Sequence, residues 1–195
     1  MAVLGCKLAN VSIISKINTP LRTFAINLST LKPTPITVKV GDEIPDVLVY
    51  EGVPSNSFSV HNVFRGKKGI LFSVVGAFLP GCNNHIPEYL GLLKNFQAEG
   101  YHILACIAVN DPYVMAAWGK TVDPEHQIRM LSDMRCEFTK ALGAQFDSST
   151  LLGNFRSRRY AMLIDDNKIM SISTEPDSTG LACLLCLQRN KPEKT

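Results

Sequence analysis

Cys82 lies where the sequence predicts that a strand gives way to a helix. The apolar residues 69–75 predict a buried strand before it, and apolar residues recur at helical spacing after it, over residues 86–96. Pro80 and Gly81 stand at the join, where a tight turn needs a preset φ and a residue without a Cβ. We therefore expect Cys82 in the first turn of a helix, whose positive end favours the nucleophilic thiolate.

The sequence gives weaker evidence of a chemical role for the other cysteines. The chain has six cysteines with irregular spacing, which argues against the disulfide framework of a small secreted protein. Cys183 and Cys186 form one Cys-x-x-Cys pair, but no second pair accompanies it, so we expect no zinc site and no other metal. Cys106 falls inside the apolar stretch 102–109, which predicts a buried strand and an unreactive thiol. Cys136 has no evident partner in the sequence, and we assign it no role.

Three arginines, Arg156, Arg158 and Arg159, stand directly before a predicted strand over residues 160–164. A guanidinium close to Cys82 would stabilise its thiolate. From the residues alone such a cluster is more often a solvated turn, so the choice among the three stays open at this point.

Strands alternate with helices along most of the chain, which predicts an α/β domain. Periodicity alone does not select one α/β arrangement. The segment 38–50 predicts two short strands around a turn at Gly41. The later expected elements are a helix over 81–97 closed by Gly100, a strand over 102–109, a helix from Pro112 through Trp118, a strand over 128–131, a helix over 134–142, a hairpin of strands 160–164 and 169–174, and a final helix over 181–187.

The stretch 76–89, Gly-Ala-Phe-Leu-Pro-Gly-Cys-Asn-Asn-His-Ile-Pro-Glu-Tyr, resembles the active-site loop of the atypical two-cysteine peroxiredoxins of type 5. The similarity extends along most of the chain and implies a thioredoxin-like (peroxiredoxin) fold, a central sheet flanked by helices. It also implies that Cys82 is the peroxidatic cysteine and that Arg159 stabilises the thiolate and the peroxide. Arg156 and Arg158 are then expected to be surface charges.

The resemblance further implies a second redox cysteine. The stretch Glu175-Pro-Asp-Ser-Thr-Gly-Leu-Ala-Cys183 is similar to the segment that carries the resolving cysteine of the family, so Cys183 is the expected resolving residue. Two accessory candidates accompany it. Cys186 either joins Cys183 in a small redox pair or simply packs, and His85 is expected to order the site.

Pro80, Gly81 and Leu79 occupy positions at which the family binds substrate, but the loop departs from the family pattern. Leu79 replaces a Thr, Val75 replaces a Pro, and two residues instead of three separate Cys82 from the following His. A hydroxyl at position 79 would hydrogen-bond the thiolate and the peroxide, an interaction worth roughly 1.5–3 kcal/mol. Leu cannot make this bond, which predicts a weakened site.

Two functions follow from the resemblance. The first is a thiol-dependent peroxidase that reduces hydrogen peroxide and organic hydroperoxides through a sulfenic acid, closes an intramolecular disulfide and is regenerated by thioredoxin. The alternative is a catalytically impaired peroxiredoxin-fold protein that senses redox state or binds a partner. A Cys–His acyl transferase is a third class, for which the chain offers no convincing base or orienting group. No cofactor is expected, and the family implies a homodimer.

Residues 1–36 have the composition of a mitochondrial presequence, since residues 1–41 contain five Lys or Arg but no Asp or Glu. We therefore expect a presequence over 1–36, a peroxiredoxin domain over 37–195 and a mitochondrial location; the alternative is a basic tail and a cytoplasmic location. The net charge of +3 is too small to predict a nucleic-acid partner. The longest apolar run is about half of the ~20 residues that span a membrane, so no membrane partner is expected.

Overall fold

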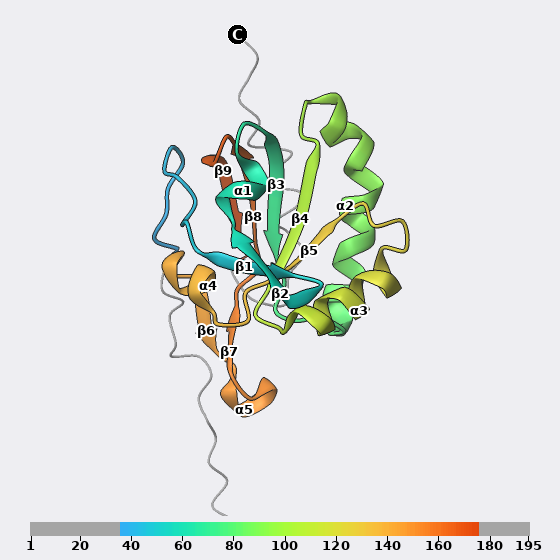
Figure 1. Cartoon of the computed structure of the whole chain (residues 1–195), viewed down its shortest axis with the longest axis vertical. Helices are drawn as coiled ribbons and strands as arrows, with labels where there is room; N and C mark the ends of the chain where they lie inside the picture. Colours follow the sequence, from blue (N-terminus) through green and yellow to red (C-terminus); the bar gives the residue numbers. More distant parts are fainter. Residues whose placement is uncertain (1–35, 176–195) are drawn as a thin grey trace, which may run out of the picture. The chain divides into compact units, whose positions relative to one another are not determined.

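The computed structural model describes residues 36–175 as a seven-stranded sheet with helices on both faces, together with a two-stranded sheet (Figure 1). The predicted presequence, apart from residue 36, and the predicted helix over 181–187 lie outside the described residues. In chain order the elements are β1 (Leu48–Glu51), β2 (Val53–Ser59), α1 (His61–Phe64), β3 (Lys68–Ser73), α2 (Pro80–Ala98), β4 (Ile103–Ala108), α3 (Pro112–Val122), β5 (Arg129–Ser132), α4 (Glu137–Ala141), β6 (Gln145–Asp147), α5 (Ser149–Leu152), β7 (Phe155–Ser157), β8 (Tyr160–Asp165) and β9 (Lys168–Thr174).

Three parallel strands form the middle of the large sheet, whose order is β2-β1-β5-β4-β3-β8-β9. β3, β4 and β5 run in the same direction, whereas β8 lies antiparallel to β3, and β1 lies antiparallel to β5. Because β3 and β4 are covered on both faces, nearly all of their residues are buried. The chain passes from β3 to α2 at the carboxyl edge of these strands, the edge at which open α/β sheets bind ligands.

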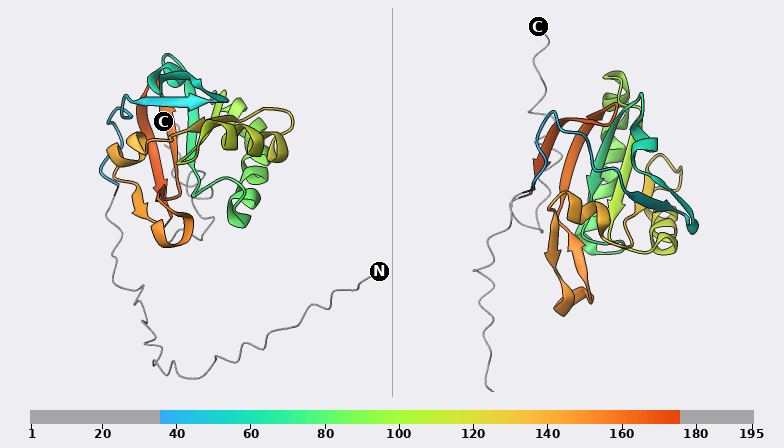
Figure 2. Two further views of the ribbon diagram at one scale, coloured as in Figure 1. Left: turned by 60° about the horizontal axis from the view of Figure 1, so that its bottom comes forward. Right: turned by 60° about the vertical axis from the view of Figure 1, so that its left-hand side comes forward.

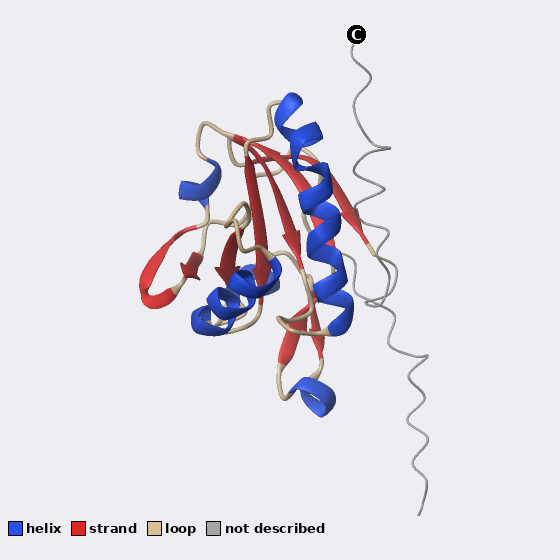
Figure 3. Ribbon diagram, turned by 90° about the vertical axis from the view of Figure 1, so that its right-hand side faces the viewer, coloured by secondary structure: helices blue, strands red, loops and turns tan. Residues whose placement is uncertain are grey.

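Two hydrophobic cores lie on opposite faces of the sheet, because successive side chains of a strand point in opposite directions. Phe72 of β3 packs in one core with Tyr89 of α2 and Trp118 of α3. Leu71, its neighbour in the same strand, packs in the other core with Phe138 of α4. Figure 3 shows the long helix α2 running along one side of the strands. Packing along the length of α2 thus places its first turn beside the end of β3.

The hydrophobic pattern predicted most of these elements. The strand and the helix on either side of Cys82 are β3 and α2, the apolar stretch 102–109 is β4, and α3 begins after Asp111, its N-cap. Gly100 has a φ of +89° and donates its backbone N–H to the carbonyl of Gln97, as expected of a residue that closes a helix. The predicted α/β class is confirmed.

The first predicted strand is wrong. Residues 38–40 form no strand, because the chain turns at Gly41, which has a φ of +94°. This segment joins β9 through an isolated bridge between Glu43 and Lys168 and through the backbone N–H of Gly41, which donates to the carbonyl of Ile169. The second strand predicted there is present as β1, which begins at Leu48.

The helix predicted over residues 134–142 is shorter in the structure, where α4 spans Glu137–Ala141. Cys136 has a left-handed backbone with a φ of 59° and precedes the helix. The buried carboxylate of Asp133 then accepts hydrogen bonds from two backbone N–H groups of the first helical turn. A cap that reaches across a turn in this way leaves no periodic signal in the sequence.

The hydrophobic pattern predicts no element over residues 145–157, where the structure has β6, α5 and β7. Figure 2 shows this segment projecting beyond the end of the large sheet. β6 and β7 pair with each other, and β7 ends at Ser157, two residues ahead of Arg159. The three arginines therefore lie on and just after a paired strand, not in a solvated turn.

Candidate active site

The first turn of α2 carries Cys82, which is the third residue of the helix, with Leu79 as the N-cap. The bend that leads into the helix is tight, and Phe78 has a positive φ of 62°, a backbone conformation that residues other than glycine rarely adopt. Gly81 is needed for another reason, since a Cβ there would lie 3.2 Å from Nη2 of Arg159. Cys82 thus has its predicted place at the positive end of a helix.

A buried guanidinium contacts the sulfur of Cys82. Nη2 of Arg159 lies 3.2 Å from Sγ of Cys82 and donates to it, and the two residues are 3% and 0% exposed. Arginine stays charged in proteins, so a buried guanidinium needs an electron-rich partner. The sulfur of Cys82 is such a partner, and the contact places a fixed positive charge directly beside it. Of the three arginines, Arg159 is the one that the fold brings to this cysteine.

His85 extends this pair into a row of three buried side chains. Its Nδ1 lies 3.5 Å from Nη1 of Arg159. Burial and, secondarily, the charge of Arg159 lower the pKa of His85 from 6.5 to about 4, so the ring is neutral at pH 7. Because arginine only donates hydrogen bonds, Nδ1 is the acceptor and the ring proton is on Nε2. The rings of Phe72 and Tyr89 pack against His85, which is thereby placed to orient the guanidinium.

Leu79 and Pro80 lie at the solvent side of the site. Leu79 is half-buried, Pro80 is exposed, and 51% of the surface of Phe78 is exposed. The side chain of Leu79 makes no capping hydrogen bond, whereas Ser, Thr, Asn or Asp at an N-cap accepts one from the first helical turn. The solvent-facing residues at the start of α2 are therefore apolar, and the turn that carries Cys82 has no side-chain cap.

A hydrogen bond from α3 supports this turn. Nε1 of Trp118, which is fully buried, donates to Oδ1 of Asn83 at 2.7 Å. Asn83 directly follows Cys82, and its own carbonyl loses its usual helical donor because Pro87, four residues on, has no N–H. The contact between α2 and α3 thus stabilises the helix where its own hydrogen-bond ladder is incomplete.

The expectation that Arg156 is a surface charge is wrong. The side chain is half-buried, and its Nη1 donates to the carbonyl of Val109 at 2.6 Å. The same nitrogen lies 3.4 Å from the position that a Cβ on Gly76 would take, and Oδ1 of Asn110 lies 3.5 Å from it. Arg156 and Asn110 therefore pack against the loop that leads from β3 to α2. Arg158, also expected at the surface, is half-buried, and burial lowers the pKa of its guanidinium.

The remaining predicted cysteines divide into two groups. Cys106 in β4 is fully buried, and burial raises the pKa of its thiol well above the ordinary value, which confirms its predicted place in the core. Cys136 is buried at the start of α4, and burial raises the pKa of its thiol as well. Cys183 and Cys186 lie outside the described residues.

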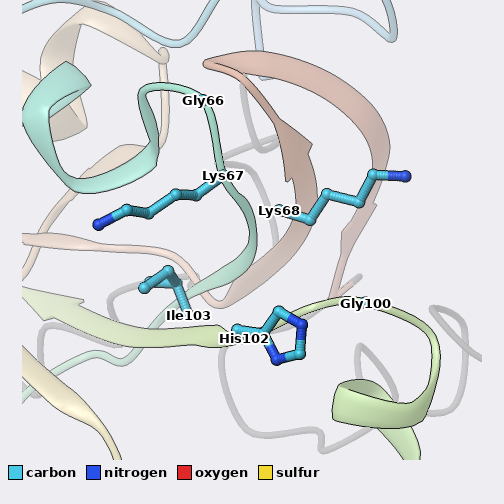
Figure 4. A pocket seen from close by; sticks show the side chains of 6 residues that line it. All are labelled: Gly66, Lys67, Lys68, Gly100, His102 and Ile103. Carbon is cyan, nitrogen blue, oxygen red and sulfur yellow. The ribbon is translucent and has the colours of Figure 1, made fainter.

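A surface cavity of about 500 Å³ lies at one end of the sheet (Figure 4). It surrounds the first residues of β3 and β4, whereas Cys82 follows the carboxyl end of β3. Its cationic lining is partly neutralised, since Nζ of Lys68 lies 3.3 Å from Oδ2 of Asp165. The residues that line the cavity are Gly66, Lys67, Lys68, Gly100, His102 and Ile103.

Within residues 36–175, no three side chains are grouped to hold a metal ion, and no helix is long and apolar enough to cross a bilayer.

Known proteins share this architecture. The family model Redoxin matches residues 39–183. Peroxiredoxin-2D of Arabidopsis thaliana is 38% identical over 145 residues, which cover 72% of this chain and 88% of the plant protein. The crystal structure of peroxiredoxin 5 from Alvinella pompejana is 76% identical, with a TM-score of 0.72, over 78% of this chain and 99% of that chain. The crystal structure of reduced Prx3 in complex with H2O2 from Vibrio vulnificus is 35% identical, with a TM-score of 0.65, over 71% of this chain and 88% of that chain.

These matches cover the part of the chain that builds the site. The matched family range contains Cys82 and Arg159 and ends at Cys183. The predicted thioredoxin-like fold agrees with the solved structures that the chain resembles. The chain therefore belongs to the redoxin family and is, within it, a peroxiredoxin, a thiol-dependent peroxidase of thioredoxin-like fold.

Proposed function

We propose that Cys82 is the residue that reduces peroxide and that Arg159 stabilises both its thiolate and the charge that develops on the peroxide. The contact of 3.2 Å between Nη2 of Arg159 and Sγ of Cys82 carries this proposal. Both residues are buried, and electrostatic interactions are stronger away from water. Pro80, Gly81 and Leu79, which directly precede Cys82 at the start of α2, are the proposed substrate-binding positions.

The proposed reaction is an attack of the Cys82 thiolate on the terminal oxygen of the hydroperoxide. A sulfur–oxygen bond forms, the oxygen–oxygen bond breaks, and the sulfur is oxidised by two electrons to a sulfenic acid. The leaving alkoxide or hydroxide takes up one proton and departs as an alcohol or water. Arg159 is the group placed to stabilise the charge that moves from sulfur to oxygen, because its guanidinium donates hydrogen bonds and carries a fixed positive charge.

We further propose that Cys183 resolves the sulfenic acid by forming an intramolecular disulfide with Cys82 and releasing water. Glu175 supports this route, because its backbone N–H donates to the carbonyl of Arg159 at 3.2 Å. The chain therefore passes the site eight residues before Cys183, and eight extended residues span roughly 26 Å. A thioredoxin dithiol is the proposed reductant of the disulfide. Cys186 is a candidate second partner in that exchange.

The alternative function, a redox-sensing or binding protein with an impaired site, is favoured by one observation. Leu79, the N-cap of α2, has no hydroxyl, whereas a hydrogen-bond donor beside Cys82 would assist the leaving oxygen. In this alternative Cys82 reacts with peroxide slowly or not at all, although the fold and the contact with Arg159 are retained.

The two functions are separated by stopped-flow addition of hydrogen peroxide to the fully reduced full-length chain, followed by peptide mass spectrometry. The proposed peroxidase forms one Cys82–Cys183 disulfide and converts one equivalent of peroxide per cycle. The Cys82→Ser variant should lose the reaction, whereas the Cys106→Ser variant, a matched change in a buried cysteine, should retain it. Persistence of the Cys82 thiol under excess peroxide would establish the impaired alternative instead.

We also propose, from composition and family resemblance, that residues 1–36 direct the chain to mitochondria and that the mature protein forms a homodimer. Fusion of residues 1–36 to a fluorescent reporter tests the address, and cytosolic fluorescence would count against it. Sedimentation of the reduced and oxidised protein tests the dimer, for which a single monomeric species at micromolar concentration would be the contrary result.

A further inference from the structure

The chain changes its pairing partner just before Arg159. The antiparallel ladder between β3 and β8 ends at the pair Phe72 and Ala161. On the other side β7 pairs with β6 and ends at Ser157. Arg158 and Arg159 therefore lie between these two ladders, where single backbone hydrogen bonds rather than a paired strand hold them.

Two buried serines meet between these ladders. Oγ of Ser73, the last residue of β3, donates to the carbonyl of Arg158, and Oγ of Ser157 lies 3.0 Å from the same carbonyl oxygen. The two hydroxyl oxygens lie 3.3 Å apart. Ser73 is 0% and Ser157 1% exposed, so water does not compete for these bonds. A carbonyl oxygen has two lone pairs and can accept from both hydroxyls at once.

We propose that Ser73 and Ser157 form a clamp on the carbonyl of Arg158 that positions the guanidinium of Arg159 on the sulfur of Cys82. Both serines are positioning residues, since their hydroxyls act through the backbone carbonyl next to Arg159. The inference rests on the proposed role of Arg159 in peroxide reduction. It assigns to the reaction two residues that have no ionisable group and lie outside the loop that carries the cysteine.

The segment that carries the clamped carbonyl is hydrogen-bonded on both sides of that carbonyl. The backbone N–H of Arg158 donates to the carbonyl of Ala144 at 2.8 Å, and the carbonyl of Arg159 accepts from Glu175 at 3.2 Å. Ser73 is itself the point at which β3 leaves the sheet toward the loop of Cys82. One hydroxyl of Ser73 thus ties the strand that delivers the cysteine to the strand that delivers the arginine. Its loss would let the two side chains move relative to each other.

The test is a double-mutant cycle on the rate of Cys82 oxidation by hydrogen peroxide, measured by stopped flow on the full-length reduced chain. The variants are Ser73→Ala, Arg159→Gln and the pair. Ser171→Ala is the matched control, because Ser171 is a buried serine on β9 of the same sheet. Ser73→Ala should slow oxidation about fivefold, the effect of one net hydrogen bond. In the Arg159→Gln background the same change should alter the rate by less than about twofold.

The structural cost of losing a hydroxyl is monitored by thermal unfolding of each variant, and Ser73→Thr, which keeps the hydroxyl, should restore the rate. Should Ser73→Ala not fold, Ser157→Ala replaces it in the same cycle. Equal slowing in both backgrounds, or slowing no larger than in Ser171→Ala, would overturn the clamp while the role of Arg159 stands. A wild-type rate in Arg159→Gln would instead refute the proposed role of Arg159, and the clamp with it.

Discussion

Replacement of Leu79 by Thr should raise the rate at which Cys82 reacts with peroxide. Leu79 is the N-cap of α2, and its backbone carbonyl accepts the N–H of Cys82 at 2.9 Å, so positions 79 and 82 share one turn. A hydroxyl at position 79 therefore lies in the same turn as the sulfur. It can donate to the thiolate or the peroxide, or it can cap the helix by accepting from a backbone N–H.

The two roles of the hydroxyl have different magnitudes. A hydrogen bond to a charged group is worth about 1.5–3 kcal/mol, which corresponds to roughly 10- to 150-fold in rate if the bond acts only in the transition state. A new N-cap adds about 1 kcal/mol to the free energy of unfolding. The lost packing of the half-buried Leu79 removes a similar amount. We therefore expect a large change in rate and little change in thermal stability.

The assay compares Leu79→Thr with Leu79→Val, because Val has the shape of Thr but lacks the hydroxyl. Stopped-flow oxidation by hydrogen peroxide gives the rate for each variant, and thermal unfolding gives the stability. The Thr variant should react at least about tenfold faster than the Val variant. Equal rates in the two variants would refute the reasoning, whether or not the Thr variant is more stable, since a cap alone would change only the unfolding temperature.

Three further predictions concern the surroundings of the site. The pKa of His85 is lowered from 6.5 in the unfolded chain to about 4, so its contribution to stability is complete above pH 6.5 and is lost as the pH falls toward 4, by about 3 kcal/mol in all. In chemical denaturation, the free energy of unfolding of His85→Phe should therefore fall less between pH 6.5 and pH 4 than that of the parent. An equal fall in the two proteins would contradict the shift. Gly69→Ala should lower the free energy of unfolding by about 1–3 kcal/mol, because a Cβ there would lie 2.6 Å from an aromatic carbon of α1. Gly91→Ala, with open space around it in α2, should instead raise stability by up to about 1 kcal/mol, and similar effects of the two changes in urea titrations would show that the contact is not limiting. Cys106→Ala should leave peroxide oxidation of Cys82 within about twofold of the parent rate, and a large loss in stopped flow would show that the second buried thiol takes part.

Local signals in the sequence account for the parts of the fold that were predicted correctly. β4 is apolar throughout, β3 and β8 each have an apolar run at their centre, and α2 has apolar residues at helical spacing between a Pro-Gly start and a Gly end. These patterns depend only on neighbours in the chain. The predicted start of α4 failed although the deciding contact is also local, because the side chain of Asp133 caps the helix across a left-handed Cys136 and a cap adds nothing to the hydrophobic pattern.

For the arginine cluster, too, part of the arrangement was predictable from the sequence and part was not. The sequence identifies three guanidinium groups ahead of an apolar strand, and only a family resemblance selects Arg159 among them. Strand alternation alone would group Arg156 and Arg158 on one side and Arg159 on the other. In the structure Arg156 packs against the loop at Gly76, and Arg159 reaches the sulfur. The pairing of β7 with β6, which no hydrophobic pattern predicts, fixes the backbone of Arg156 opposite Phe146.

The sequence by itself determined that a cysteine stands at the start of a helix after a buried strand, because both elements are specified by the residues within them. Only the tertiary structure decided which cation meets the sulfur, since Arg159 is 77 residues away in the chain and arrives through the pairing of β8 with β3. The hydrogen bonds of Ser73 and Ser157 to the carbonyl of Arg158 were likewise decided only by the tertiary structure. A single serine adds nothing to the hydrophobic pattern of a sequence. Ser73 and Ser157 reach the same carbonyl only because β3 and β7, which are far apart in the chain, end close together in the fold.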